Sequence, residues 1–334
     1  MSSGLAASST SAEEAPIGVL VMAYGTPAGL DQVEEYYTHI RHGRAPSDEQ
    51  LADLIARYDA IGGVSPMRER TMEQISTISK HLDALTESDS GAPRFVVELG
   101  QKHTTPFIED GVQALLSAGA KVIVGLVLAP HYSAASVGQY HERAVAELAG
   151  RGEYRAIDDW SQDQAFIDFT AESLRSRLNA AEDKDVVVVF TAHSLPLRVL
   201  ENDPYEERLV GSARAIADAA GIAQRTEGAE AEGATSGGVV WRMGWQSAGR
   251  TPEPWIGPDI LEIINSTAQE IPGGEIVVVP QGFTSDHLEV LFDLDIEARR
   301  AAESVGLTLD RTETINADSA VMKALADLVA EAAS

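Results

Sequence analysis

The feature that most constrains the fold is a series of short apolar runs separated by segments with helical spacing. The runs do not alternate with polar residues; they cover residues 17–22, 95–99, 122–128, 186–190, 239–245 and 276–279, with a weaker one at 154–160. Continuously apolar strands are buried on both faces, as in a parallel sheet covered by helices. The helical segments between them include residues 105–118, 136–149 and 163–179. This alternation predicts an α/β fold with doubly wound parallel sheets.

The chain has 334 residues, and single hydrophobic cores usually stop growing near ~250–300 residues. We expect two similar Rossmann-like halves because the β–α rhythm restarts near Tyr154. The predicted organisation is a disordered tail (1–15), a first α/β domain (16–155 plus a C-terminal helix within 313–334) and a second α/β domain (156–312). The stretch 223–238, rich in Gly, Ala and Glu, is predicted to be a flexible surface loop.

The composition limits partners and chemistry. With 25 basic and 52 acidic residues, the net charge of −27 makes nucleic acid and anionic membranes poor partners. The absence of cysteine excludes disulfides, thiol catalysis and a cysteine-ligated iron–sulfur cluster. No basic, apolar leader and no apolar run of ~18–20 residues occurs, so we expect a soluble cytoplasmic protein.

The usual nucleotide motifs of α/β proteins are missing. No strand is followed by G-x-G-x-x-G, no G-x-x-x-x-G-K-[ST] occurs, and H-E-x-x-H is absent. The stretch 244–249 (GWQSAG) has a tryptophan where a nucleophile elbow needs its first glycine. Nucleotide-dependent and serine-hydrolase chemistry therefore have no support.

Ligands in open α/β sheets bind beyond the carboxyl ends of strands, and one such end carries His193 directly after the run 186–190. An imidazole there suits metal binding or proton transfer near neutral pH. A buried histidine that only bonds a neighbouring loop explains the pattern equally well.

A second candidate is the acidic row Glu289, Asp293 and Glu297. On an α-helix, residues four apart advance by ~40° and ~6 Å, which would align the three carboxylates on one face. Oxygen ligands with a nearby imidazole suit ferrous iron. A solvated acidic face paired with Arg299 and Arg300 is the alternative.

The region 36–44 (YYTHIRHGR) gathers aromatic and basic residues in an otherwise acidic chain, and Arg57 and Tyr58 follow soon after. Arginine recognises carboxylates bidentately, and tyrosine offers a flat apolar face with a polar end. These residues suit a flat aromatic polycarboxylate, although an ordinary surface helix would show the same composition.

Together these segments resemble the ferrochelatase family, and within it the soluble bacterial coproporphyrin ferrochelatases. The matching segments are LVMAYGTP (20–27), YYTHIRHGRAP (36–46), RYDAIGGVSP (57–66), GQKHTTPFIED (100–110), LAPHYS (128–133), AHSLP (192–196), GWQSAGRTPEPWIGP (244–258) and GFTSDHLEVLFD (282–293). The resemblance implies two α/β halves with a porphyrin cleft between them.

The resemblance also implies roles for residues. His193 and Glu289 match the catalytic pair that binds the metal, and Asp293 and Glu297 would continue as metal ligands. The expected porphyrin-binding residues are Tyr24, Arg41, Arg57, Tyr58, Ser65 and Tyr140.

The expected activity is insertion of ferrous iron, as a substrate, into coproporphyrin III in haem biosynthesis, with no cofactor required. The alternatives are a protoporphyrin IX ferrochelatase, a cobalt chelatase and a non-catalytic porphyrin or haem carrier. We further expect a monomer that makes transient contact with neighbouring haem-pathway enzymes.

Overall fold

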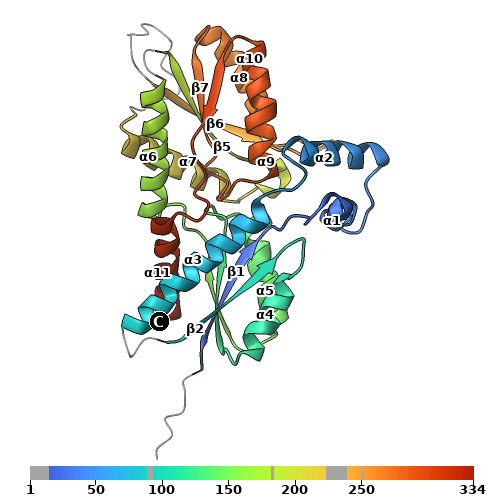
Figure 1. Ribbon diagram of the computed structural model, residues 1–334, viewed down its shortest axis with the longest axis vertical. Helices are drawn as coiled ribbons and strands as arrows, with labels where there is room; N and C mark the ends of the chain where they lie inside the picture. The colour runs from blue at the N-terminus through green and yellow to red at the C-terminus, as the bar shows by residue number, and fades with distance from the viewer. Residues whose placement is uncertain (1–14, 89–92, 182–183, 223–238, 250) are drawn as a thin grey trace, which may run out of the picture.

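The computed structural model describes residues 15–88, 93–181, 184–222, 239–249 and 251–334. Two four-stranded sheets occupy its lower and upper halves as drawn (Figure 1). The predicted loop at 223–238 and nearly all of the predicted tail lie outside the described residues.

The first sheet has the strand order β2-β1-β3-β4, and all its strands are parallel. Its strands are β1 (Ile17–Ala23), β2 (Phe95–Gln101), β3 (Val122–Val127) and β4 (Glu153–Ile157). Residues 19–22 of β1 are fully buried, as the continuous apolar run predicts.

The second sheet repeats this arrangement with the order β6-β5-β7-β8, again all parallel. Its strands are β5 (Val186–His193), β6 (Val240–Gln246), β7 (Glu275–Val279) and β8 (Thr308–Arg311). The expectation of two similar parallel sheets is confirmed. The prediction that the β–α pattern restarts near Tyr154 was wrong, because β4 pairs with β3 and completes the first sheet. The proposed domain boundary at 155 falls within β4.

Helices cover both faces of each sheet. The first sheet lies between α4 (Ile108–Ser117) and α5 (Gln139–Leu148) on one face and α3 (Met67–Ser88) and α11 (Ser319–Ala333) on the other. The second lies between α8 (Ile260–Glu270) and α10 (Arg299–Ser304) on one face and α6 (Gln164–Ala180) and α7 (Tyr205–Ala220) on the other.

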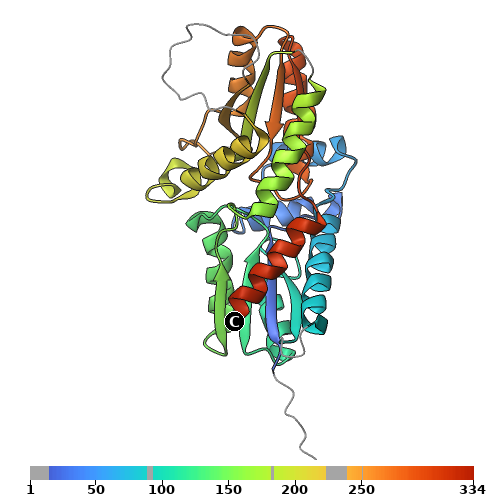
Figure 2. The same cartoon turned by 90° about the vertical axis from the view of Figure 1, so that its left-hand side faces the viewer.

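One hydrophobic cluster joins the two halves. It contains Val19 of β1 and Val188 of β5, together with Leu174 of α6 and Leu325 of α11. Figure 2 shows α6 and α11 running along the same side of the molecule, one above the other, and their residues are in contact. The C-terminal helix therefore packs on the first sheet, as predicted, and also contributes to a core shared with the second.

Between β1 and α3 the chain forms α1 (Val33–Ile40) and α2 (Asp48–Ala60). Helix α2 begins at Ser47, whose hydroxyl accepts from the Gln50 amide while the Gln50 side chain accepts from the Ser47 amide. Figure 1 places this pair of helices beside α9 (Leu288–Leu291) of the second half. Residues of the first half thus reach the loop that follows β7.

The segment 288–304 is not the uniform α-helix that the acidic row assumed. After α9 the chain forms a π-helical turn, η4 (Asp293–Ala298), in which the Glu297 amide donates to the Phe292 carbonyl at 2.9 Å. Wider turns of this kind occur frequently at functional sites. Strand β8 was also missed, because TLDR is short and three of its four residues are polar.

Candidate active site between the two sheets

The site begins at the carboxyl ends of two equivalent strands. Strand β1 ends at Ala23 and is followed by Tyr24, whereas β5 ends at His193 itself. The turn after Tyr24 requires Gly25, whose φ is +90° and whose added Cβ would lie 2.4 Å from the Thr104 hydroxyl. Both strands occupy the same place in their sheets, so topology alone brings these residues to corresponding edges.

Two histidines flank the carboxylate of Glu289. His193 Nε2 lies 3.6 Å from Glu289 Oε1, and His287 Nε2 lies 3.5 Å from Oε2. The Nδ1 atoms face backbone carbonyls, that of Ser194 at 2.5 Å and that of Ser285 at 3.1 Å. Because a carbonyl only accepts, each Nδ1 carries a proton and each Nε2 faces the carboxylate. About a third of the His193 and Glu289 side chains is exposed, so the pair is open to a ligand.

The charge on Glu289 controls the protonation of His193. Burial alone would lower the pKa of His193, but the charge and hydrogen bond of Glu289, the Ser194 carbonyl and Asp293 together raise it to about 8. Burial would raise the pKa of Glu289, and the two imidazoles outweigh this effect and hold it well below its usual range. In the unliganded site a proton therefore lies between the imidazole and the carboxylate.

Asp293 lies one turn further along, at the start of η4. Its side chain is only 7% exposed, with Oδ1 3.3 Å from Nη1 of Arg57 and Oδ2 accepting from the Ser247 hydroxyl at 2.5 Å. Burial and then the Glu289 charge raise the pKa of Asp293 to about 7, although Ser247 and Arg57 act in the opposite direction. The carboxyl group of Asp293 therefore holds a proton more readily than that of Glu289.

Tyrosines of the first half line the site beside Glu289. The Tyr36 hydroxyl donates to the Gly25 carbonyl at 3.1 Å, and the Tyr58 hydroxyl lies 3.4 Å from that of Thr26. Burial first, and then the Glu289 charge, raises the pKa of Tyr24. Burial, followed by the interactions with Tyr24 and Tyr58 and then the Glu289 charge, raises the pKa of Tyr36. For Tyr58, burial and the Glu289 charge outweigh the Thr26 hydrogen bond and raise the pKa to about 12. These phenols are neutral at physiological pH.

The remaining predicted porphyrin-binding residues differ in what they contact. Tyr140 of α5 is buried, and the Lys102 ammonium lies 5.0 Å from its ring centre. Arg41 follows α1, where its guanidinium lies 5.5 Å from the Tyr37 ring and donates to the Arg44 carbonyl. Ser65 is buried, and its hydroxyl accepts from the Met67 amide at the start of α3. Ser65 therefore stabilises a helix end in this structure.

The predicted metal ligands do not form one preformed cage. Within the described residues, no set of three or more His, Asp or Glu side chains has the geometry to hold a metal ion. His193 and Glu289 are adjacent, Asp293 is bonded to Arg57 and Ser247, and Glu297 is half-buried further along η4. The row is better described as successive carboxylates than as a closed site.

Several neighbours of the pair were not predicted. His287 is the second imidazole on Glu289, and the Tyr205 hydroxyl donates to the His193 carbonyl at 3.1 Å. Gln246 at the end of β6 donates to the Glu289 carbonyl at 2.8 Å. Gln246 and His287 lie within segments that carried the family resemblance, so their sequence context was a usable signal.

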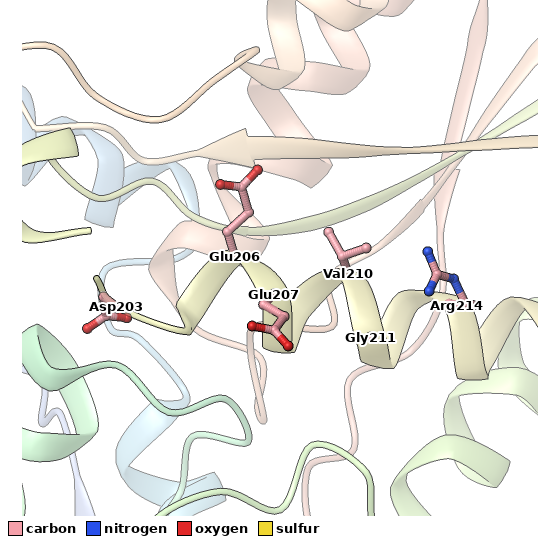
Figure 3. A pocket seen from close by; sticks show the side chains of 6 residues that line it. All are labelled: Asp203, Glu206, Glu207, Val210, Gly211 and Arg214. Atoms are coloured by element: carbon pink, nitrogen blue, oxygen red, sulfur yellow. The ribbon is translucent and has the colours of Figure 1, made fainter. Parts of the chain in front are cut away.

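Two surface hollows lie away from this pair. One, of about 610 Å³, follows α7, and Figure 3 shows its lining residues Asp203, Glu206, Glu207, Val210, Gly211 and Arg214. The other, of about 420 Å³, is lined mostly by charged residues, among them Arg311 and Asp286. Neither contains a predicted site residue.

In the part of the chain that the structure describes, no helix is both long and apolar enough to cross a bilayer.

Among solved structures, the fold is similar to those of SirB and CbiX. SirB from Bacillus subtilis, solved with Fe³⁺, superposes with a TM-score of 0.52 at 14% identity, with 96% of each chain covered. CbiX, described as the terminal enzyme for biosynthesis of siroheme in denitrifying bacteria, gives 0.50 at 9% identity, covering 96% of this chain and 99% of that one. At these identities the likeness concerns the fold alone.

The sequence comparisons give the family. The ferrochelatase family model matches residues 16–333, so the chain belongs to the ferrochelatase family and is a metal chelatase. The chain is 41% identical over 319 residues to the coproporphyrin III ferrochelatase of Geobacillus kaustophilus, covering 93% of this chain and 94% of that protein. It is 42% identical over 318 residues to coproporphyrin III ferrochelatase 2 of Bacillus anthracis, covering 94% and 93%.

Proposed function

We propose that this protein inserts ferrous iron into coproporphyrin III, releasing two pyrrole protons. The observation that carries the proposal is the His193–Glu289 pair at the end of β5, which is partly exposed to solvent. The pair is close enough to Tyr24 for the Glu289 charge to raise the pKa of that phenol. The relatives named coproporphyrin III ferrochelatases, aligned over nearly their whole length, support this choice of porphyrin.

The geometry suggests how the pair acts. A divalent cation can replace the proton between His193 Nε2 and Glu289 Oε1, because both atoms face the same 3.6 Å gap. Once the cation has passed to the porphyrin nitrogens, the same two groups are free to accept the pyrrole protons. His193 and Glu289 therefore serve as metal ligands and as proton acceptors in turn.

The first half would bind the macrocycle. Tyr24 is 39% exposed and carries a neutral phenol, so its uncharged ring can lie against the face of the porphyrin opposite the pair. A cleft that bends the ring would turn the pyrrole lone pairs toward the incoming iron and lower the barrier. Arg41, Arg57, Tyr58, Ser65 and Tyr140 complete the proposed porphyrin-binding set.

Asp293 and Glu297 are proposed to bring iron to the pair. They follow Glu289 along α9 and η4, and oxygen ligands suit a divalent cation in transit. The net charge of −27 attracts cations and repels the porphyrin tetracarboxylate, so binding of the latter depends on local arginines. We further propose a cytoplasmic monomer with transient contacts to neighbouring haem-pathway enzymes.

The test is anaerobic metallation, followed by porphyrin absorbance, with coproporphyrin III and protoporphyrin IX side by side. Faster insertion of ferrous iron into the tetrapropionate is the expected result. Preference for protoporphyrin IX, insertion of cobalt but not iron, or tight binding of both porphyrins without metallation would each contradict it. These outcomes would indicate, in turn, the protoporphyrin enzyme, a cobalt chelatase and a carrier.

A further inference from the structure

The pairing of Arg57 is not the one expected of a residue that binds propionate. Its Nη1 lies 3.3 Å from Asp293 Oδ1, and its Nε lies 3.4 Å from Asp53 of the same helix. The guanidinium carbon lies 5.0 Å from the centre of the Phe292 ring. The predicted porphyrin ligand thus lies against the predicted metal route.

This contact joins the two halves one helical turn beyond Glu289. Arg57 is in the last turn of α2, and Asp293 begins η4, 236 residues further along the chain. Both oxygens of Asp293 are engaged, one by Arg57 and the other by Ser247. A divalent cation that approached Asp293 in this state would meet a guanidinium charge already beside the carboxylate.

We propose that Arg57 is a substrate-operated gate on the row of carboxylates, and this inference rests on the proposed function. Without porphyrin, Arg57 pairs with Asp293 and disfavours cation binding there. A porphyrin propionate then draws the guanidinium away and frees Asp293 for the incoming iron. Metal loading is thereby coupled to the presence of the acceptor ring.

The exposure of the two partners supports an exchange. Arg57 keeps 29% of its side chain exposed whereas Asp293 keeps 7%, so the arginine is the partner that can turn toward a ligand in the opening. A propionate offers the guanidinium two oxygens, whereas Asp293 offers only Oδ1 because Ser247 holds the other. The exchange needs a change in one side chain and no movement of the sheets.

Thermodynamic linkage makes the gate measurable without turnover. If porphyrin tightens the binding of a divalent cation by some factor, the cation must tighten porphyrin binding by the same factor. Mn²⁺ is a suitable probe because it prefers oxygen ligands, and its free form is detected by electron paramagnetic resonance. We expect coproporphyrin III to tighten Mn²⁺ binding by about fivefold or more in the unaltered protein.

Simple attraction between a polyanionic porphyrin and Mn²⁺ would also give coupling, so variants are needed. Arg57→Gln should bind Mn²⁺ without porphyrin about as tightly as the unaltered protein does with it, leaving less than about twofold coupling. Arg41→Gln is the matched control: it removes another arginine of the proposed porphyrin set, one that donates to the Arg44 carbonyl and has no carboxylate partner among the described residues. At saturating porphyrin this control should keep the full coupling.

A second variant guards against misfolding of the first. Asp293→Asn removes the gated carboxylate, so Mn²⁺ binding should be weak in both states and the coupling should vanish. Full coupling in Arg57→Gln or in Asp293→Asn would overturn the proposal, as would its absence from the unaltered protein. If the protein metallates coproporphyrin III without this coupling, only the gating role of Arg57 is contradicted. If it does not metallate coproporphyrin III, the proposed function is contradicted.

Discussion

The two halves share one sheet topology and differ in what their strands deliver. Strand β1 of the first sheet is followed directly by Tyr24, whereas the equivalent strand β5 of the second sheet ends at His193. The raised pKa of Tyr24 keeps its phenol protonated and therefore neutral. The raised pKa of His193 keeps its imidazole protonated at neutral pH, and this group is therefore positively charged. The same scaffold therefore presents a neutral phenol at one strand end and a charged imidazole at the other.

The histidines after the third strand of each sheet show the same contrast. His131, after β3, is buried, and its Nε2 lies 2.7 Å from the Ser212 hydroxyl. Burial lowers its pKa to about 3, so it is a neutral structural group. His287, after β7, faces the carboxylate of Glu289 instead. Whether such a histidine takes part in chemistry depends on a nearby carboxylate, which the strand pattern does not reveal.

The shared core allows the sharpest test of whether the halves are separate. Leu325 of α11 is fully buried in the cluster that contains residues of both sheets, so Leu325→Ala should lower the free energy of unfolding by about 2–5 kcal/mol. Urea unfolding should remain a single transition because both halves lose the same packing. Glu331→Ala, at an exposed position of the same helix, should change stability by less than about 0.5 kcal/mol. Two transitions, of which only one shifts, would show that the halves are independent.

The ionic side of the comparison depends on Glu289. Glu289→Gln removes the charge that holds the proton on His193, while burial continues to favour the neutral imidazole. The pKa of His193 should therefore fall from about 8 by at least about one unit. Proton NMR titration of the imidazole measures this without requiring activity. An unchanged titration in the variant would mean that another group holds the proton.

For the unaltered enzyme, kcat/KM should rise with pH through about 8, as the neutral form of His193 becomes available to bind iron.

The aromatic side should discriminate among porphyrins. Arg41→Ala removes a cation that faces the Tyr37 ring and donates to the Arg44 carbonyl. Within the described part of the chain it forms no ion pair that would compete with a propionate. Binding of the tetracarboxylate should weaken by about tenfold, because a hydrogen bond to a charged group contributes about 1.5–3 kcal/mol. Binding of a dicarboxylate should weaken by less, because it has fewer propionates for Arg41 to contact. Fluorescence titration with both porphyrins measures the difference. Equal losses would remove Arg41 from the proposed propionate contacts.

The sequence predicted the sheets better than the site. Every residue of runs such as 186–190 is apolar, so the sequence predicted buried parallel strands. Strand β8 was not predicted, because three of the four residues of TLDR are polar. The position of His193 at a strand end was also predictable. The π-helical turn at Asp293 was not predicted, because the acidic row was placed on a regular α-helix. The pairing of Arg57 with Asp293 was not predicted either, because the two residues are 236 positions apart in the sequence.

The central claim is that the second half handles iron while the first half holds the porphyrin. It is tested most directly by His193→Ala, in which coproporphyrin III affinity and the rate of anaerobic iron insertion are measured on the same preparation. The account predicts a dissociation constant within about twofold of that of the unaltered protein and a rate lower by about 10² or more, the usual contribution of a positioned acid–base group. Unchanged insertion with normal porphyrin binding would contradict the claim.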